Sequence, residues 1–227
     1  TKTQERFRML NAGFILFGLG GAAIFEAIFQ GVGFSHHETY RLGLTFYGGL
    51  ILCIVFATIF LKRMQINLHF AANLYSIPLV VAHAIGRIGC FMAGCCFGSE
   101  TSSFLGVTYP NSSLPFAHYH HCVSIHPVQL YEAFGLLTIA MVLCSIRFKY
   151  RASAYLLTYP VLRFVLEFYR ADERGSFFGV TTLSPSQVIS MVLFVVGLAL
   201  FFSFRQFKLI SSIEEIVYFY VKFIRKS

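Results

Sequence analysis

An arginine stands at the end of a long apolar stretch of this chain. Residues 71–86 contain no Asp, Glu, Lys or Arg, and Arg87 follows them directly. A guanidinium does not lose its proton in a protein, so next to hydrocarbon it needs an anionic partner or a water-filled cavity. Arg87 is therefore the first candidate for a functional site.

Two later apolar stretches also carry polar residues, at spacings that place them together on helix faces. Gln129 and Glu132 are three residues apart and share one face. The second stretch has three charged residues, four and three apart, which share one stripe: Arg163, Glu167 and Arg170. One interpretation of Arg163 and Glu167 is an ordinary buried ion pair that holds helices together.

The charges of this predicted group do not balance. Three arginines stand against two glutamates, which leaves a positive remainder. This excess positive charge is suited to an anionic ligand, such as a lipid phosphate bound by the planar guanidinium group of an arginine. The predicted phosphate-binding residues are Arg87, Arg163 and Arg170.

The composition is that of a membrane protein. Of the 227 residues, 56% are hydrophobic and 12% are charged, and the mean hydropathy is +0.68. Soluble domains carry about twice that charged fraction. The net charge of +8 fits basic loops against anionic headgroups better than nucleic acid, and we expect no nucleic acid partner. A single integral membrane domain, residues 1–227, accounts for the whole chain.

Six stretches approach the roughly 20 residues that a bilayer requires. They cover residues 10–32, 42–61, 71–90, 129–146, 152–169 and 185–204. The predicted fold class is therefore all-α, a polytopic transmembrane helical bundle of about six spans. In the tail, residues 212–226 alternate apolar and charged side chains, which predicts an amphipathic helix on the cytoplasmic leaflet.

The distribution of basic residues predicts the topology. They flank the spans in a pattern that places both termini in the cytoplasm: Lys2, Arg6, Arg8, Lys62, Arg63, Arg147, Lys149, Arg151, Arg205 and Lys208. Residues 91–125 contain no Lys or Arg, so we expect them on the opposite, external side. Two helix starts are predicted there, a capping box of Ser184 and Gln187 with Pro185 at the first helical position, and His126-Pro127.

Four ordered motifs resemble the prolipoprotein diacylglyceryl transferases. They are GRIG at 86–89, HPVQLYEA at 126–133, RFVLEFYRAD at 163–172 and LSPSQ at 183–187, and YGGL at 47–50 is similar to that family's His-Gly-Gly-Leu motif. Four motifs in order are more specific than any one alone. The resemblance adds a set of supporting motif residues: Gly48, Gly49, Gly86, Gly89, Gln129 and Tyr131.

The resemblance implies an enzyme of the bacterial cytoplasmic (inner) membrane whose site faces the periplasm. It would transfer a diacylglyceryl group from phosphatidylglycerol to the thiol of a lipobox cysteine in a lipoprotein precursor, with no cofactor. Arg87 with Arg163 or Arg170 would hold the phosphate, while Glu132 and Glu167 would orient these arginines. The alternatives are transfer of a lipid group to another acceptor, or a protein that binds or moves anionic phospholipid.

The motifs depart from the family at several positions. Tyr47 stands where the family has histidine, and a phenol that titrates near pH 10 is a poor base. His126 and His83 are candidates for the base, although His126 is better interpreted as a helix cap. The family also has asparagine, asparagine and glutamate at positions that here hold Cys90, Ala93 and Cys95. Family members usually have seven spans. The six spans counted in this sequence therefore predict that the first span of the family is missing or trimmed.

The cysteines suggest a second chemistry. Four of them map to the external side: Cys90, Cys95, Cys96 and Cys122. In an oxidising compartment we expect one or two disulfides, closing a loop of about 30 residues to Cys122. A thiolate beside Arg87 could instead act as a nucleophile. A zinc site with His118, His120 and His121 is a further alternative, but no CxxC pair of standard spacing supports it, and we expect no metal.

Overall fold

The computed structural model describes residues 2–31, 44–171 and 184–206, and it is mostly helical. Six long helices coincide with the six predicted stretches: α1 (Lys2–Gly31), α3 (Leu44–Arg63), α4 (Leu68–Ala93), α6 (Val128–Ser145), α7 (Arg151–Leu166) and α8 (Pro185–Gln206). Two short 3₁₀ turns precede and follow α7: η1 (Phe148–Tyr150) and η2 (Glu167–Tyr169). The predicted tail helix at 212–226 lies outside the described residues.

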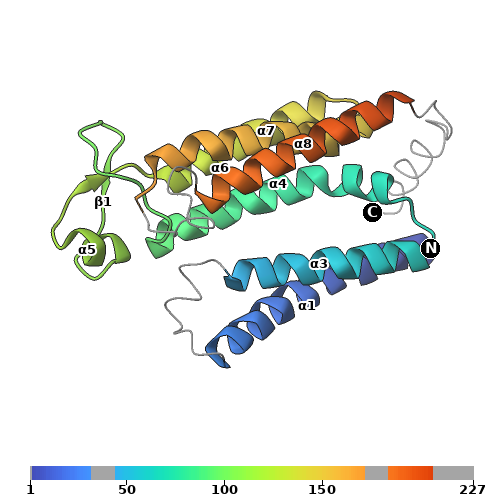
Figure 1. Ribbon diagram of the computed structural model, residues 1–227, viewed down its shortest axis with the longest axis horizontal. Coiled ribbons are helices and arrows are strands. Elements are labelled where there is room, and N and C mark those ends of the chain that lie inside the picture. Colours follow the sequence, from blue (N-terminus) through green and yellow to red (C-terminus); the bar gives the residue numbers. More distant parts are fainter. Residues whose placement is uncertain (1, 32–43, 172–183, 207–227) are drawn as a thin grey trace.

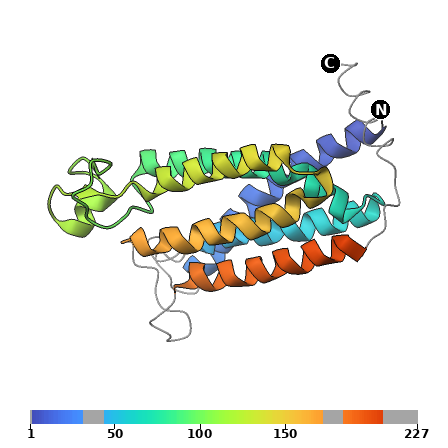
Figure 2. The same ribbon diagram turned by 90° about the horizontal axis from the view of Figure 1, so that it is seen from above.

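Helices α4, α6, α7 and α8 lie side by side and form what we call the four-helix body (Figures 1 and 2). Its apolar centre joins α4 to α6. On α4, Val80 and Ala84 are spaced one turn apart and face Leu136, Ala140 and Leu143 of α6, all buried. Small residues opposite large ones let the two helices approach closely.

A proline and a glycine explain the close packing of α7 against α8. Pro160 lies inside α7 and has no N–H, so it leaves the carbonyl of Leu156 without its helical donor. Gly197 of α8 lies against that carbonyl, because a Cβ added at Gly197 would fall 2.9 Å from the Leu156 oxygen. The glycine therefore lets α8 cover the interrupted turn of α7.

Helices α1 and α3 form a separate hairpin, the α1–α3 pair, beside the four-helix body (Figure 1). Its contact with α4 centres on Leu10, Leu61 and Ala71, near the start of α4. The Tyr75 hydroxyl donates a 2.6 Å hydrogen bond to Asn11 Oδ1 at the same place. The hairpin is thus attached to the body at the end where α1 begins and α3 ends.

Residues 94–127 form a cap at the opposite end of the four-helix body (Figures 1 and 2). The cap contains β1 (Val107–Thr108), α5 (Leu114–Tyr119) and β2 (Ser124–Ile125), and β1 pairs with β2 antiparallel. The all-α prediction is therefore correct for the bundle and wrong for the cap. A short strand pair escapes detection because two residues show no period-2 pattern.

The cap is fastened to the bundle by backbone pairing. Gly98 forms a β-bridge with Arg170, and the Ser99 N–H donates to the Tyr169 carbonyl at 2.8 Å. A second β-bridge, between Glu100 and Ile125, lies within the cap. A side chain at position 98 would collide with the His126 carbonyl, since an added Cβ would lie 2.4 Å from it. Glycine is therefore required where the chain at Gly98 passes between the start of α6 and the end of η2.

Four described helices are long and apolar enough to cross a membrane: Gln4–Ile28, Leu68–Ala93, Val128–Ser145 and Ser186–Ser203. The protein is a membrane protein by this criterion, and the six-span topology remains a prediction. One of the two predicted helix starts is confirmed, since the Gln187 N–H donates to Ser184 Oγ at 3.2 Å and Gln187 Oε1 accepts from the Ser184 N–H at 3.0 Å. The other differs: α6 begins at Val128 after Pro127, with no side-chain cap.

Candidate active site

Glu132 of α6 is the centre of a buried charge cluster. Its side chain is 1% exposed. Oε1 lies 3.1 Å from Arg87 Nε of α4 and accepts a 3.0 Å hydrogen bond from the Tyr159 hydroxyl of α7. Oε2 lies 3.7 Å from Arg163 Nη1, also on α7. One carboxylate therefore joins three helices.

Glu167 holds the second half of the cluster at the end of α7. Its Oε2 lies 2.6 Å from Arg163 Nη2 and 4.0 Å from Arg170 Nε. Arg163 Nη2 also donates to Ser186 Oγ of α8 at 3.0 Å. The predicted stripe is thus confirmed. Its ion pair is not isolated, because Arg163 is shared with Glu132 and with α8.

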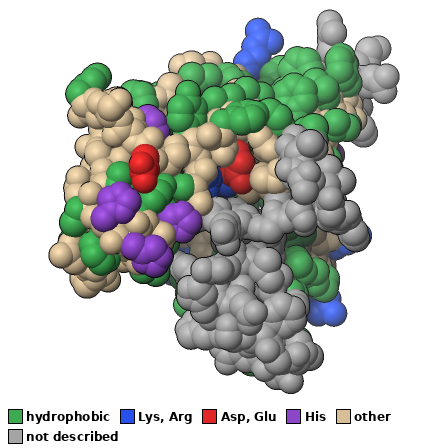
Figure 3. All heavy atoms as spheres, turned by 60° about the vertical axis from the view of Figure 1, so that its left-hand side comes forward, with side chains coloured by type: hydrophobic (Ala, Val, Ile, Leu, Met, Phe, Trp, Pro, Cys, Tyr) green, Lys and Arg blue, Asp and Glu red, His purple; other side chains and the backbone are tan. Residues whose placement is uncertain are grey.

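The five residues Arg87, Glu132, Arg163, Glu167 and Arg170, here called the arginine–glutamate cluster, come from three helices and a 3₁₀ turn that meet near the cap. Arg87 lies two turns before the end of α4, Glu132 in the second turn of α6, and Arg170 directly after η2. In the space-filling view of this end, acidic and basic atoms lie recessed beside the cap (Figure 3).

The cluster carries more positive than negative charge. It has three guanidinium groups and two carboxylates, and the side chains of Arg163 and Arg170 are 6% and 3% exposed. Arg87 Nε and Arg163 Nη1 are buried and make no hydrogen bond to any residue that the structure describes, although both lie within ion-pair distance of Glu132. Glu132 is thus paired with both arginines by charge but does not satisfy these two donors by hydrogen bonds. The arrangement is suited to an additional anion.

Three aromatic residues complete the cluster. Besides Tyr159, the ring of His83 lies with Nε2 3.8 Å from Glu132 Oε1, and its Nδ1 lies 3.5 Å from the Tyr155 hydroxyl. The His83 and Tyr159 rings are 5.0 Å apart. His83 was predicted from the sequence, whereas Tyr155 and Tyr159 were not. Helical spacing could have identified them, because Tyr155 and Tyr159 precede Arg163 by eight and four residues and so lie on the same stripe of α7.

His126, Tyr131 and Gln129 lie beside the cluster and support the cap. His126 Nδ1 is 3.1 Å from the Tyr131 hydroxyl, and its ring packs on Tyr169. The prediction that His126 caps α6 is wrong, because Pro127 occupies the cap position. Gln129 is buried and donates a 2.7 Å hydrogen bond to the Cys95 carbonyl. These contacts give His126 a structural place at the junction of cap and bundle.

The Gly-Gly motif serves helix packing. A Cβ at Gly48 would lie 2.7 Å from the Gly21 oxygen, and one at Gly49 would lie 2.6 Å from the Gly18 oxygen, so α3 touches the backbone of α1. Tyr47 belongs to the first turn of α3, and its side chain is outside the described part.

Gly86 and Gly89, which flank Arg87, behave differently from the Gly-Gly motif. A Cβ added at either would meet no described atom within 4 Å. They leave the backbone of α4 open beside the guanidinium.

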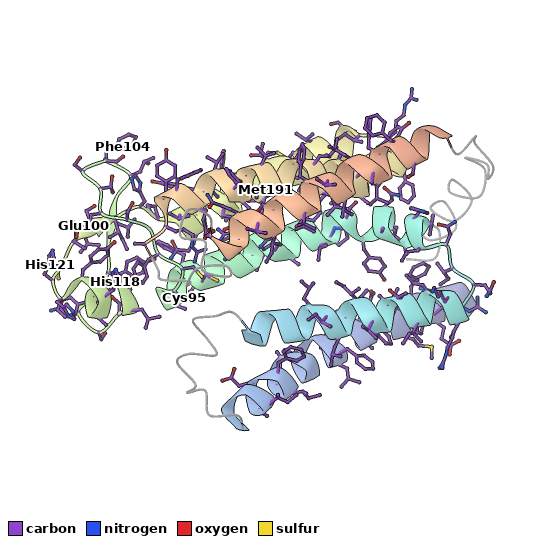
Figure 4. All side chains as sticks on the ribbon, viewed as in Figure 1. Cys95, Glu100, Phe104, His118, His121 and Met191 are labelled. Carbon is purple, nitrogen blue, oxygen red and sulfur yellow. The ribbon has the colours of Figure 1, made fainter. Side chains whose placement is uncertain are left out.

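The expected disulfides are absent. All six cysteines are described, and none is disulfide-bonded. Cys122 is exposed in the cap, where its Sγ donates to Asn111 Oδ1 at 2.9 Å. The sulfur atoms of Cys90, Cys95 and Cys96 instead lie within 4.8 Å of one another, and no histidine among the described residues joins that group. His118 packs on Phe97, with ring centroids 5.3 Å apart, and His121 lies at the edge of the cap far from Cys95 (Figure 4).

Comparison with known proteins agrees with the motifs. A family model described as prolipoprotein diacylglyceryl transferase matches residues 2–203. This chain belongs to that family. The match extends over all the described helices of the four-helix body and over the α1–α3 pair, apart from the last residues of α8.

Individual members of the prolipoprotein diacylglyceryl transferase family show the degree of similarity. The phosphatidylglycerol–prolipoprotein diacylglyceryl transferase of Clostridium tetani is 32% identical over 164 residues, which are 70% of this chain and 63% of that protein. That of Rickettsia bellii is 30% identical over 72% of this chain and 62% of its own length. That of a Wolbachia of Brugia malayi is 28% identical over 86% and 77%. The chain thus matches less than two thirds of the first two relatives.

Proposed function

We propose that this protein transfers a diacylglyceryl group from phosphatidylglycerol to the cysteine thiol of a lipoprotein precursor. The observation that carries the proposal is the excess positive charge of the arginine–glutamate cluster, in which two carboxylates hold the half-buried Arg87 and the buried side chains of Arg163 and Arg170. Membership in the family and the names of the relatives support the same substrate and acceptor.

The cluster fits the phosphate of the donor lipid. Arg87 approaches from α4, and Arg163 and Arg170 from α7 and the turn after it, so a phosphate between them would meet guanidinium groups from two sides. Gly86 and Gly89 leave space beside Arg87 for the lipid glycerol. Glu132 and Glu167 fix the guanidinium planes, which a protein that only binds lipid would not need.

The reaction places negative charge where these arginines lie. The acceptor sulfur forms a bond to the terminal glyceryl carbon of the diacylglyceryl group, and the bond from that carbon to the phosphate oxygen breaks. Glycerol phosphate leaves with the bonding electrons, and its developing charge is stabilised by guanidinium donors already in place. The thiol proton must be removed, because the thiolate is the nucleophile.

His83 is the best-placed group to accept that proton. It lies one helical turn before Arg87, is 24% exposed, and has Nε2 3.8 Å from Glu132. His126 faces Tyr131 and Tyr169 instead. We therefore assign His83 the role of base, which the family motif gives to the position of Tyr47.

We further propose six spans in the bacterial inner membrane with the cap toward the periplasm. Basic residues at helix ends opposite the cap support this orientation, among them Lys62 and Arg63 at the end of α3 and Arg151 at the start of α7. The cap, in contrast, contains no Lys or Arg. The positive-inside rule then places the cluster near the outer leaflet.

The test is a reconstituted reaction. The full chain in liposomes with phosphatidylglycerol would be incubated with a lipobox peptide, and the thioether product and glycerol phosphate quantified by mass spectrometry. We expect both products in equal amounts, lost in Arg163→Ala and retained in Arg147→Ala, whose exposed arginine lies at the other end of the bundle. Lipid binding without either product would overturn the transferase and favour a phospholipid-binding protein.

A further inference from the structure

Three cysteine sulfur atoms meet where α4 ends. Cys90 is in the last turns of the helix, and Cys95 and Cys96 follow its end at Gly94. Their Sγ atoms all lie within 4.8 Å of one another. Figure 4 places Cys95 at this point, between the four-helix body and the cap. The group shares no residue with the arginine–glutamate cluster, although Cys90 follows Arg87 by only three residues.

The backbone around these sulfurs is held in a specific turn. Gly94 has φ 70° and Cys96 has φ 61°, both left-handed. A left-handed non-glycine residue is uncommon and persists where surrounding contacts impose it. Here the Cys95 N–H donates to the Cys90 carbonyl at 3.1 Å, and buried Gln129 donates to the Cys95 carbonyl at 2.7 Å. The turn brings Cys95 and Cys96 back toward Cys90.

A tyrosine of the cap fixes the same turn from outside. The Tyr109 hydroxyl donates to the Phe91 carbonyl at 3.1 Å, and its ring packs edge-on against Phe91. Burial raises the pKa of Tyr109 to about 12, so the hydroxyl remains a donor at neutral pH. The three sulfurs are therefore preorganised by the helix end, by α6 and by the cap.

We propose that Cys90, Cys95 and Cys96 form a thiolate site for a soft d¹⁰ metal ion, Zn²⁺ or Cu⁺. Thiolate ligands select these ions. Two sulfurs bound to one Zn²⁺ at about 2.3 Å lie about 3.8 Å apart, so a small closure of the observed group completes the site. Binding releases the thiol protons to solvent, and no electron is transferred.

The number of ligands separates the two ions. No His, Asp, Glu or further Cys among the described residues joins the three sulfurs. Cu⁺ would be bound by the three thiolates alone, whereas Zn²⁺ would complete a tetrahedron with a solvent molecule. A bound ion would tie the end of α4 to the turn that enters the cap, and so would restrain the helix that carries Arg87.

The site is tested by metal binding, independently of any transferase activity. The full chain, purified in detergent and reduced without oxygen, would be titrated with Zn²⁺ or with Cu⁺ in the presence of a competing chelator, and bound metal measured by elemental mass spectrometry. We expect one ion per chain and a thiolate-to-metal absorption band with Cu⁺. Single changes Cys90→Ser, Cys95→Ser and Cys96→Ser should each weaken binding at least tenfold.

Two other cysteines supply matched controls. Cys122→Ser and Cys144→Ser remove exposed thiols outside the group and should leave binding unchanged. If only one of the two ions binds stoichiometrically, the proposal is supported and that ion is the one that the site binds. No stoichiometric binding of either ion, equal loss in the Cys122→Ser control, or a disulfide among the three cysteines in protein taken directly from membranes would overturn the proposal. Elution volume and thermal midpoint would identify any variant that fails to fold.

Discussion

Helices α1 and α3 approach each other through glycine backbones, whereas α4, α6 and α7 are joined by buried charges. In the α1–α3 pair, Gly48 and Gly49 lie against the carbonyls of Gly21 and Gly18, and the Phe17 and Phe56 rings stack at 4.5 Å. None of the described residues of this pair belongs to the arginine–glutamate cluster.

The two regions illustrate two ways of holding helices in a bilayer. Lipid is as apolar as a leucine side chain, so helices associate through close packing of small residues or through polar contacts. Packing of the first kind serves assembly and needs no charge. Charged side chains are expensive to place in a membrane, and five of them at one end of the four-helix body, four with side chains less than 10% exposed, indicate a function beyond assembly.

The largest effect is expected for Glu132→Ala. It removes the carboxylate that contacts Arg87, Arg163 and Tyr159 and so takes from Arg87 its carboxylate partner, while Arg163 keeps Glu167. Breaking a buried ion pair costs about 3–5 kcal/mol, so both stability and transfer should be lost. Thermal unfolding in detergent would measure this, with Glu100→Ala, an exposed carboxylate of the cap, as the control. A shift no larger than that of the control would refute the central role of Glu132.

A second large effect is expected on activity alone. Arg87→Lys keeps the positive charge near Glu132 but cannot reproduce the planar fork. We expect a decrease in kcat of about 10²-fold, the order found when one preorganised donor is removed, with little change in thermal midpoint. Initial rates with saturating phosphatidylglycerol would show it. A wild-type kcat in this variant would mean that the reaction needs only the positive charge of Arg87 and not the planar geometry of its guanidinium group.

A smaller effect is expected for Tyr159→Phe. The change removes the 3.0 Å hydrogen bond to Glu132 and leaves the ring against His83. Hydrogen bonds to charged groups contribute about 1.5–3 kcal/mol, so the rate should fall about tenfold or more. Tyr131→Phe, which removes a hydroxyl that contacts His126 outside the cluster, should change the rate less. The reverse order would place the reacting groups near His126.

The smallest effect, and one confined to the α1–α3 pair, is expected for Gly49→Ala. The new methyl group would lie 2.6 Å from the Gly18 carbonyl oxygen, and overpacking of this kind costs about 1–3 kcal/mol. Gly20→Ala on α1 meets no described atom within 4 Å and should not destabilise. The thermal midpoint should fall in the first variant only, while the folded protein keeps its activity. A decrease in kcat in Gly49→Ala without a change in thermal midpoint would show that the α1–α3 pair contributes to the reaction.

Much of the bundle was predictable because long apolar stretches and buried charges are strong signals. All six predicted stretches are helical in the structure, and the capping box at Ser184 is present. The stripe of Arg163, Glu167 and Arg170 follows from helical spacing alone. Its proximity to Glu132 and Arg87 also followed, since the predicted topology placed all five residues at the same end of the bundle.

The cap and the cysteines were less predictable, for physical reasons. Compartment and spacing favoured a disulfide to Cys122, but pairing depends on a turn at Gly94 and Cys96 whose left-handed residues have no sequence pattern beyond one glycine. His126 was assigned to a helix cap because His-Pro often opens helices, yet packing on Tyr131 and Tyr169 takes the ring elsewhere. Tertiary contacts decided both outcomes.

The central claim is that the arginine–glutamate cluster binds the phosphate of the donor lipid. The most direct measurement is a cryo-electron microscopy structure of the full chain in nanodiscs of phosphatidylglycerol, with an antibody fragment to add mass. We predict phosphate density within hydrogen-bond distance of Arg87 and of Arg163 or Arg170. A lipid phosphate bound instead at Arg147 and Lys149, with no phosphate density at the arginine–glutamate cluster, would contradict the account.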